Sequence, residues 1–179
     1  MQRAESRSVV VLGIDPGLAN LGFGVVGRRS GRLVALDGGV IRTPAGVAPE
    51  RRLADLQLRV SALIAEHNPD AMALEALYFG QNVRTAFAVG QARGVVLAAA
   101  GSRNVPCHDY TPQQVKGAVC GSGRAAKDQV IRMVQVLLSL PAEPIADHAA
   151  DALAVAICHA NHAPLRESSR AAATLAGAR

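Results

Sequence analysis

The chain has 179 residues, of which 50% are hydrophobic, and it carries a formal net charge of +5 at pH 7. This length fits one domain with a sizeable core, and this composition excludes a largely disordered protein. The basic charge favours an anionic partner such as nucleic acid, although a soluble protein with spare surface lysines and arginines would have the same charge.

The cysteines and the apolar runs exclude several other classes. Cys107, Cys120 and Cys158 are odd in number and have no CxxC spacing, which argues against a disulfide framework and a structural zinc site. The first eight residues lack the apolar core of a signal peptide, and no apolar run reaches the ~18 residues of a membrane span. We therefore expect a reduced, soluble, cytoplasmic protein without a membrane partner.

The N-terminal part of the chain predicts three strands joined by short links. An unbroken apolar run from Val9 ends in a carboxylate at Asp15, and Pro16-Gly17 then interrupts the pattern. A second apolar run covers Leu21–Val26, and a third, weakened by glycine, covers Gly31–Ile41. Sequential strands with such short links predict an antiparallel meander.

The rest of the chain predicts alternating helices and strands, which gives an α/β domain with a mixed sheet. Short strands are expected at Ala71–Glu75 and Val105–His108. Residues 1–8 are expected to be flexible, and residues 163–179 to form a mobile tail. Helices are predicted at Pro49–Glu66, Gln81–Ala100, from Pro112 with Thr111 as its cap, Ala125–Leu140 and Asp147–His159.

Acidic residues end several of these elements. Asp15 ends the first strand, Glu75 ends the fourth, and His148 and Asp151 are three residues apart, so they share one helix face. Carboxylates with an imidazole suit Mg²⁺ or Mn²⁺, and carboxylates this close would repel each other without a cation. Their joint placement indicates a divalent-metal site.

Each of these residues also has a simpler interpretation. Asp15 before a proline is typical of a turn, and Glu75 is typical of a surface acid at a strand end. Asp147 fits the N-cap of the last helix, and a lone His148 is more often structural or solvated. The metal site explains the four acidic and imidazole side chains together, whereas these alternatives explain them one at a time.

Four segments carry a specific resemblance to a known family. The sequence closely resembles the RuvC family of Holliday junction resolvases in GIDPGLANLGFGVV, LEALYFGQNVRTAFAVGQARGVVLAAA, YTPQQVKGAVCGSGRAAKDQV and ADHAADALAVAICHA, which occur in the family's order. The match covers about residues 9–162. GIDPG alone is a weak signal, but the other three segments together are highly specific.

The resemblance implies an RNase H-like nuclease domain over residues 9–162, with a five-stranded mixed sheet whose first three strands are antiparallel, flanked by helices. It implies an acidic tetrad at Asp15, Glu75, His148 and Asp151. This tetrad would bind two divalent metal ions per subunit, Mg²⁺ or Mn²⁺, which would hydrolyse phosphodiester bonds. The third position is aspartate in some relatives, and histidine there favours Mn²⁺ as the softer ion. His148 is either a metal ligand or a general base, and Asp147 is a possible further ligand.

The resemblance also implies contacts with DNA. Lys116 and Lys127 match positions that contact the DNA backbone near the scissile phosphate, and Arg84 and Arg124 are candidates for further contacts. Tyr78 matches an aromatic position that stacks on a base at the junction centre. Two alternatives are left open: Lys127 is a solvated helix residue, or Tyr78 only anchors its loop.

Paired symmetric nicks in a four-way DNA junction require two active sites, so the resemblance implies a homodimer. We expect its interface on the small-residue face of the Gln81–Ala100 helix, where Gly90 and Gly94 would allow close approach. The resemblance further implies RuvA and RuvB, the branch-migration proteins, as partners in homologous recombination and DNA repair.

Three other functions compete with junction cleavage as interpretations of this sequence. One is an RNase H-like nuclease that acts on RNA precursors. Another is an actin-like ATPase, which needs two such domains and more residues than this chain has. The third is a non-catalytic junction-binding module, which would gain nothing from clustered negative charge facing phosphate.

Overall fold

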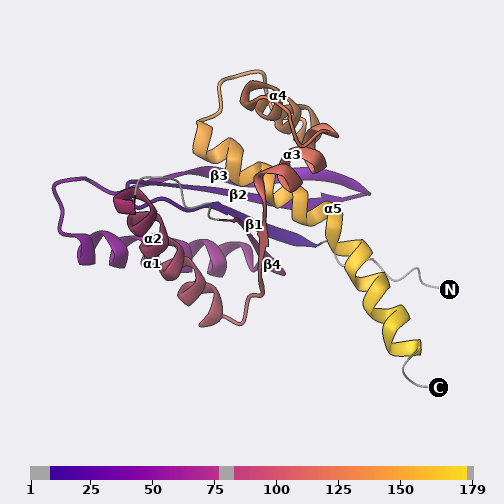
Figure 1. Cartoon of the computed structure of the whole chain (residues 1–179), viewed down its shortest axis with the longest axis horizontal. Coiled ribbons are helices and arrows are strands. Elements are labelled where there is room, and N and C mark those ends of the chain that lie inside the picture. Colours follow the sequence, from indigo (N-terminus) through magenta and orange to yellow (C-terminus); the bar gives the residue numbers. More distant parts are fainter. Residues whose placement is uncertain (1–8, 77–82, 177–179) are drawn as a thin grey trace.

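The structure is a computed structural model that describes residues 9–76 and 83–176, with side chains described as far as His162 except those of residues 83 and 84. Its five-stranded sheet has the order β3-β2-β1-β4-β5 (Figure 1). β1 and β3 pair antiparallel with β2, whereas β4 pairs parallel with β1 and β5. The predicted mixed sheet is confirmed. Its strands are β1 (Val10–Asp15), β2 (Asn20–Arg29), β3 (Arg32–Arg42), β4 (Ala71–Glu75) and β5 (Cys107–Tyr110).

Helices cover both faces of the sheet, α1 and α2 on one and α3, α4 and α5 on the other (Figure 1). Successive side chains of β1 alternate between the two layers: Val11 packs in the core under α3–α5, and Leu12 and Ile14 pack in the core under α1 and α2. Burial on both faces explains why β1 is an unbroken apolar run. The helices are α1 (Pro49–His67), α2 (Val83–Gly101), α3 (Pro112–Cys120), α4 (Lys127–Leu138) and α5 (Asp147–Ala176).

Helix α5 lies unusually close to the sheet. A Cβ atom at Gly22 of β2 would collide with the backbone carbonyl of His148, and one at Gly13 of β1 would collide with that of Ala152. Residues 149–160 of the helix are buried except for Asp151, which is partly exposed, because α5 lies between the sheet and the pair α3 and α4. Glycine in the strands therefore sets the depth at which the start of α5 rests on β1 and β2.

Some predicted boundaries are wrong. β5 covers Cys107–Tyr110 rather than Val105–His108, because Val105 still belongs to the turn that closes α2, its N–H donating to the carbonyl of Ala100. The last helix was predicted to end at His159 but continues to Ala176, since a proline removes only one helical hydrogen bond and Pro164 does not stop it. The mobility predicted for residues 163–179 stays a prediction, and residues 1–8 lie outside the described part.

The described helices include none with both the length and the apolar character needed to cross a membrane.

Candidate active site

The site begins where two neighbouring parallel strands end. Ile14 of β1 pairs in register with Leu74 of β4. Asp15 and Glu75, the last residues of these two strands, therefore lie at the same edge of the sheet. Both residues are partly buried. The capped start of α3, with Thr111 accepting from the Gln114 N–H, follows β5 at this same edge. The sequence pattern predicted both carboxylates at strand ends, and the register brings them together.

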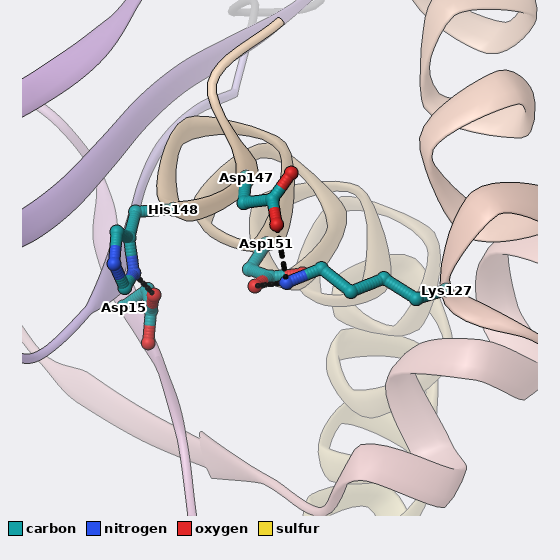
Figure 2. A network of polar contacts seen from close by, with 5 residues as sticks. All are labelled: Asp15, Lys127, Asp147, His148 and Asp151. Atoms are coloured by element: carbon teal, nitrogen blue, oxygen red, sulfur yellow. Dashed lines mark hydrogen bonds and ion pairs between the residues drawn. The ribbon is translucent and has the colours of Figure 1, made fainter.

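The first turn of α5 brings the other two candidate residues to this edge. The Nδ1 atom of His148 lies 2.7 Å from Oδ2 of Asp15. Figure 2 shows the imidazole directed at Asp15, whereas Asp151 is directed at Lys127. The contact of His148 with Gly22 fixes this arrangement, because it holds the helix backbone against β2. The predicted sharing of one helix turn by His148 and Asp151 therefore places both of them near the strand ends.

The carboxylates share one electrostatic environment. Burial, followed by the charges of Asp15 and Asp151, raises the pKa of Glu75 above its ordinary value, and Lys116 and Lys127 oppose this rise only in part. Burial also raises the pKa of Asp151, although Lys127 acts in the opposite direction. These shifts have the direction expected of carboxylates that lack sufficient positive charge around them.

Lys127, the first residue of α4, supplies part of that charge. Its Nζ atom lies 3.2 Å from Oδ2 of Asp147 and 3.3 Å from Oδ2 of Asp151 (Figure 2). Burial by itself would lower the pKa of Lys127, but the bonds to Asp147 and Asp151 outweigh it and raise that pKa. Lys127 therefore stays protonated, and Asp147 is an exposed partner of this lysine at the start of α5.

A cavity of about 190 Å³ opens beside these groups. Two acids and two lysines face it from three different helices and the end of β4, and apolar side chains complete its wall. A pocket in which cations face carboxylates can hold a phosphate group close to the acids. Its lining residues are Glu75, Pro112, Val115, Lys116, Lys127, Val130, Asp151 and Ala154.

The remaining predicted DNA contacts have different outcomes. Lys116 and Lys127 line the cavity, and their contact with DNA stays a prediction. Arg124 is exposed in the connection between α3 and α4 and is not part of the cavity wall. Arg84 lies in α2 with its side chain outside the described part of the structure, and Tyr78 lies outside the described residues altogether.

Sequence reasoning did not single out Arg93, although it lies in the GQARG segment of α2. Its Nη2 atom lies 2.5 Å from Oδ1 of Asp109, and its Nη1 donates to the backbone carbonyl of Glu75 at 3.4 Å. The guanidinium thus joins α2 to the ends of β4 and β5. The only signal in the sequence was an arginine flanked by small and apolar residues in the middle of this helix.

The donor set was tested against a divalent cation. Within residues 9–76 and 83–176, no three His, Cys, Asp or Glu side chains converge closely enough to hold a metal ion as they stand. Asp15 is instead paired with His148, and Asp151 with Lys127. The chemistry of the donors nevertheless fits Mg²⁺ or Mn²⁺, because they are carboxylates and one imidazole. Burial, and then the charges of neighbouring carboxylates, raise the pKa of Glu75 and Asp151.

A mixed five-stranded sheet of this order, with acids gathered at the ends of β1 and β4 and lysines beside them, defines an RNase H-like protein with a site suited to phosphodiester chemistry. The family described as "Crossover junction endodeoxyribonuclease RuvC" matches residues 11–159. The chain therefore belongs to the RuvC family.

Individual relatives agree with this assignment. A crossover junction endodeoxyribonuclease RuvC from Moorella thermoacetica is 52% identical over 162 residues, which are 90% of this chain and 97% of the relative. The structure of Thermus thermophilus RuvC superposes with a TM-score of 0.80 at 39% identity, covering 88% of this chain and 96% of that one. The same protein in complex with a Holliday junction substrate gives a TM-score of 0.83 with the same identity and coverage.

Proposed function

We propose that this chain is a crossover junction endodeoxyribonuclease that resolves four-way DNA junctions in homologous recombination and DNA repair. The observation that carries the proposal is the meeting of Asp15, Glu75, His148 and Asp151 at one edge of the sheet in a member of the RuvC family. The match extends over nearly the whole length of a relative with this activity, the Moorella thermoacetica protein, of which it covers 97%. Neither an RNA-processing nuclease nor a non-catalytic binding module is favoured by these relatives.

The acids and His148 would hold the metal ions of the reaction. When bound, two divalent ions, Mg²⁺ or Mn²⁺, supply the activated water and stabilise the leaving oxygen of phosphodiester hydrolysis. Besides burial, the charge of Asp15 raises the pKa of both Glu75 and Asp151, which supports Asp15 as a ligand shared by the two ions. His148 orients Asp15 through the 2.7 Å contact, and it is either a further ligand or the base that accepts a proton.

The lysines would hold the DNA strand that is cut. Lys116 and Lys127 line the same cavity as Glu75 and Asp151, so a phosphate held by both ammonium groups would lie beside the acids. Such contacts position DNA without reading its sequence. Arg124 and Arg84 would extend the backbone contacts, and Tyr78 would stack on an unpaired base at the junction centre.

A homodimer would supply the second active site for paired, symmetric nicks. An exposed stripe on α2 supports this assembly: Phe87 is 69% exposed, Leu97 is 37% exposed, and no atom of the described residues lies within 4 Å of a Cβ placed at Gly90 or Gly94. These four residues have the three-and-four spacing of a helix seam. The same face was predicted as the interface from the sequence alone.

Family membership also suggests the cellular compartment and the partner proteins of the enzyme. We take residues 9–162 as the nuclease domain and propose a cytoplasmic homodimer that acts together with the RuvA and RuvB branch-migration proteins. These assignments rest on family membership and not on a contact described above.

The deciding experiment compares three substrates with and without divalent metal. Purified protein is mixed with a four-way junction, a linear duplex or a structured RNA, in Mg²⁺, in Mn²⁺ or in EDTA. We expect symmetric paired nicks in the junction only, and none in EDTA. Cleavage of the RNA would indicate an RNA-processing nuclease, and junction binding without cleavage in either metal would indicate a binding module.

Two variants connect this activity to the site. Asp15→Asn should bind the junction as the wild-type protein does but cut it at least about 10²-fold more slowly. Asp128→Asn is the matched control, because Asp128 is an exposed acid of α4 that pairs only with Arg132 among the described residues. Loss of binding in Asp15→Asn would instead assign this residue a folding role.

A further inference from the structure

Lys127 occupies a position that its own helix does not favour. It is the first residue of α4, where the partial positive charge of the helix dipole repels a cation. Ala126, the N-cap of this helix, contributes no side-chain bond to offset that repulsion. The reason for a lysine at this position therefore lies outside α4.

That reason is the pair of acids at the start of α5. The ammonium group of Lys127 is 3.2 Å from Asp147 and 3.3 Å from Asp151, and Figure 2 shows it lying between the two carboxylates. Asp151 is the less exposed of the two acids, with 31% of its side chain accessible against 66% for Asp147. Lys127 thus lies against an oxygen of a predicted metal ligand.

We propose that Lys127 is an exchangeable counter-ion of the acidic site. In the protein without DNA, its ammonium group pairs with Oδ2 of Asp151 and competes with a divalent cation for that oxygen. When the junction binds, a phosphate of the DNA takes the place of Asp151 as the partner of the lysine. This inference rests on the proposed function, because both the cation and the phosphate belong to it.

The geometry supports exchange rather than a permanent ion pair. Both N–O distances exceed the 2.7–2.9 Å of strong charge-assisted bonds, and the lysine side chain is 55% exposed. Exposed pairs of this kind contribute little stability, so breaking them costs little. The ammonium group already faces the cavity that would receive the phosphate, and it has three donors on a flexible stem.

Exchange would make metal binding depend on DNA. A cation and an ammonium group repel each other at a shared carboxylate oxygen, so the lysine weakens metal binding until a phosphate removes it. By linkage, DNA then strengthens metal binding and metal strengthens DNA binding by the same factor. The acidic site would therefore be completed mainly on the substrate.

The first test measures Mn²⁺ binding to the full-length protein without DNA, by the loss of the free-ion signal in electron paramagnetic resonance. Lys127→Met should bind Mn²⁺ about three- to tenfold more tightly than the wild-type protein. Lys116→Met is the matched control: Lys116 lines the same cavity and its charge also reaches Glu75, but within the described part of the chain it makes no ion pair with an acid. We expect less than about a twofold change for it.

Two results of this titration would overturn the proposal. An unchanged or weaker Mn²⁺ affinity in Lys127→Met would show that the lysine does not compete with the cation. An equal gain in both variants would show that any nearby positive charge has the same effect. Thermal melting checks that both variants are folded. Lys127 is exposed at the start of a helix, where an uncharged methionine is compatible with the helix.

The second test measures the coupling itself. Junction affinity is measured with and without Mn²⁺ in the wild-type protein and in Lys127→Met, by rapid mixing on a timescale shorter than cleavage, so that Asp15 and the other predicted ligands stay in place. Mn²⁺ should strengthen junction binding by a larger factor when Lys127 is present, and equal factors would overturn the exchange. The DNA-free titration does not depend on cleavage, so a failure of the proposed function would appear only as intact junctions in the wild-type assay.

Discussion

The substitution Gly22→Ala tests whether the distance between α5 and the sheet sets the geometry of the candidate active site. In Gly22→Ala, the added Cβ would lie 2.5 Å from the carbonyl carbon of His148 and 3.0 Å from its Cβ. Carbon atoms in ordinary contact are ~3.5–4.0 Å apart, so the start of α5 must retreat by about 1 Å. That movement carries His148 away from Asp15 and shifts Asp151 with it.

A misplacement of this size is expected to raise the barrier to cleavage by about as much free energy as it removes from folding stability. We expect single-turnover cleavage of the junction to fall about 10²-fold. The free energy of unfolding should fall by ~1–3 kcal/mol, the usual cost of inserting a methyl group into a packed interior. Junction affinity in EDTA should remain within about threefold of the wild-type value, because the lysines proposed to hold the DNA backbone, Lys116 and Lys127, lie on α3 and α4 and not on α5.

The matched control is Gly38→Ala in β3. Its added Cβ would lie 3.6 Å from the nearest atom and 3.7 Å from a methyl group of Leu153 in the same helix α5, which are ordinary contacts. Gly38→Ala should therefore cleave and unfold as the wild-type protein does. Wild-type cleavage by folded Gly22→Ala, or an equal loss in both variants, would refute the link between helix depth and catalysis.

Three further predictions concern charge, packing and assembly. Burial, and then the charges of Asp15 and Asp151, raise the pKa of Glu75, so above pH 4.5 the folded protein binds more protons than the unfolded chain, and its stability falls as the pH rises through the folded pKa. Glu75→Gln should therefore be more stable than the wild-type protein in metal-free urea titrations at pH 7, but not below pH 4.5. Equal stability of the two proteins at pH 7 would contradict this prediction. Arg93→Met should lower the free energy of unfolding by ~1–2 kcal/mol in the same titrations, and Asp109→Asn should lower it by less, because the arginine side chain is 14% exposed and the aspartate side chain 54%. A larger loss of stability in Asp109→Asn than in Arg93→Met would argue against the guanidinium as the link between α2 and β4. Gly94→Glu should give monomers in light scattering, because its side chain would enter the expected interface on α2. Gly46→Asp is the control and should remain dimeric, because Gly46 lies in an exposed loop. A dimeric Gly94→Glu would show that the interface does not lie on this face of α2.

The local elements and the identity of the acids could be predicted from the sequence. Apolar runs that end in Asp15 and Glu75 predicted strands with carboxylates at their ends, and the spacing of His148 and Asp151 predicted a shared helix turn. These features are local, because strand and helix periodicity is written in neighbouring residues. The errors fell at element ends such as β5 and α5, where a turn bond or a tolerated proline overrides the pattern.

The tertiary structure alone decided which side chains meet. The pairing of Lys127 with Asp147 and Asp151 depends on how α4 packs against α5, and the link from Arg93 to Asp109 depends on how α2 lies beside the strand ends. Such contacts join residues far apart in the chain, and their geometry follows from the packing of whole elements and not from spacing. Thus the sequence determined the fold class and the acidic residues, whereas the packing determined that a lysine lies where a metal ion is expected to bind.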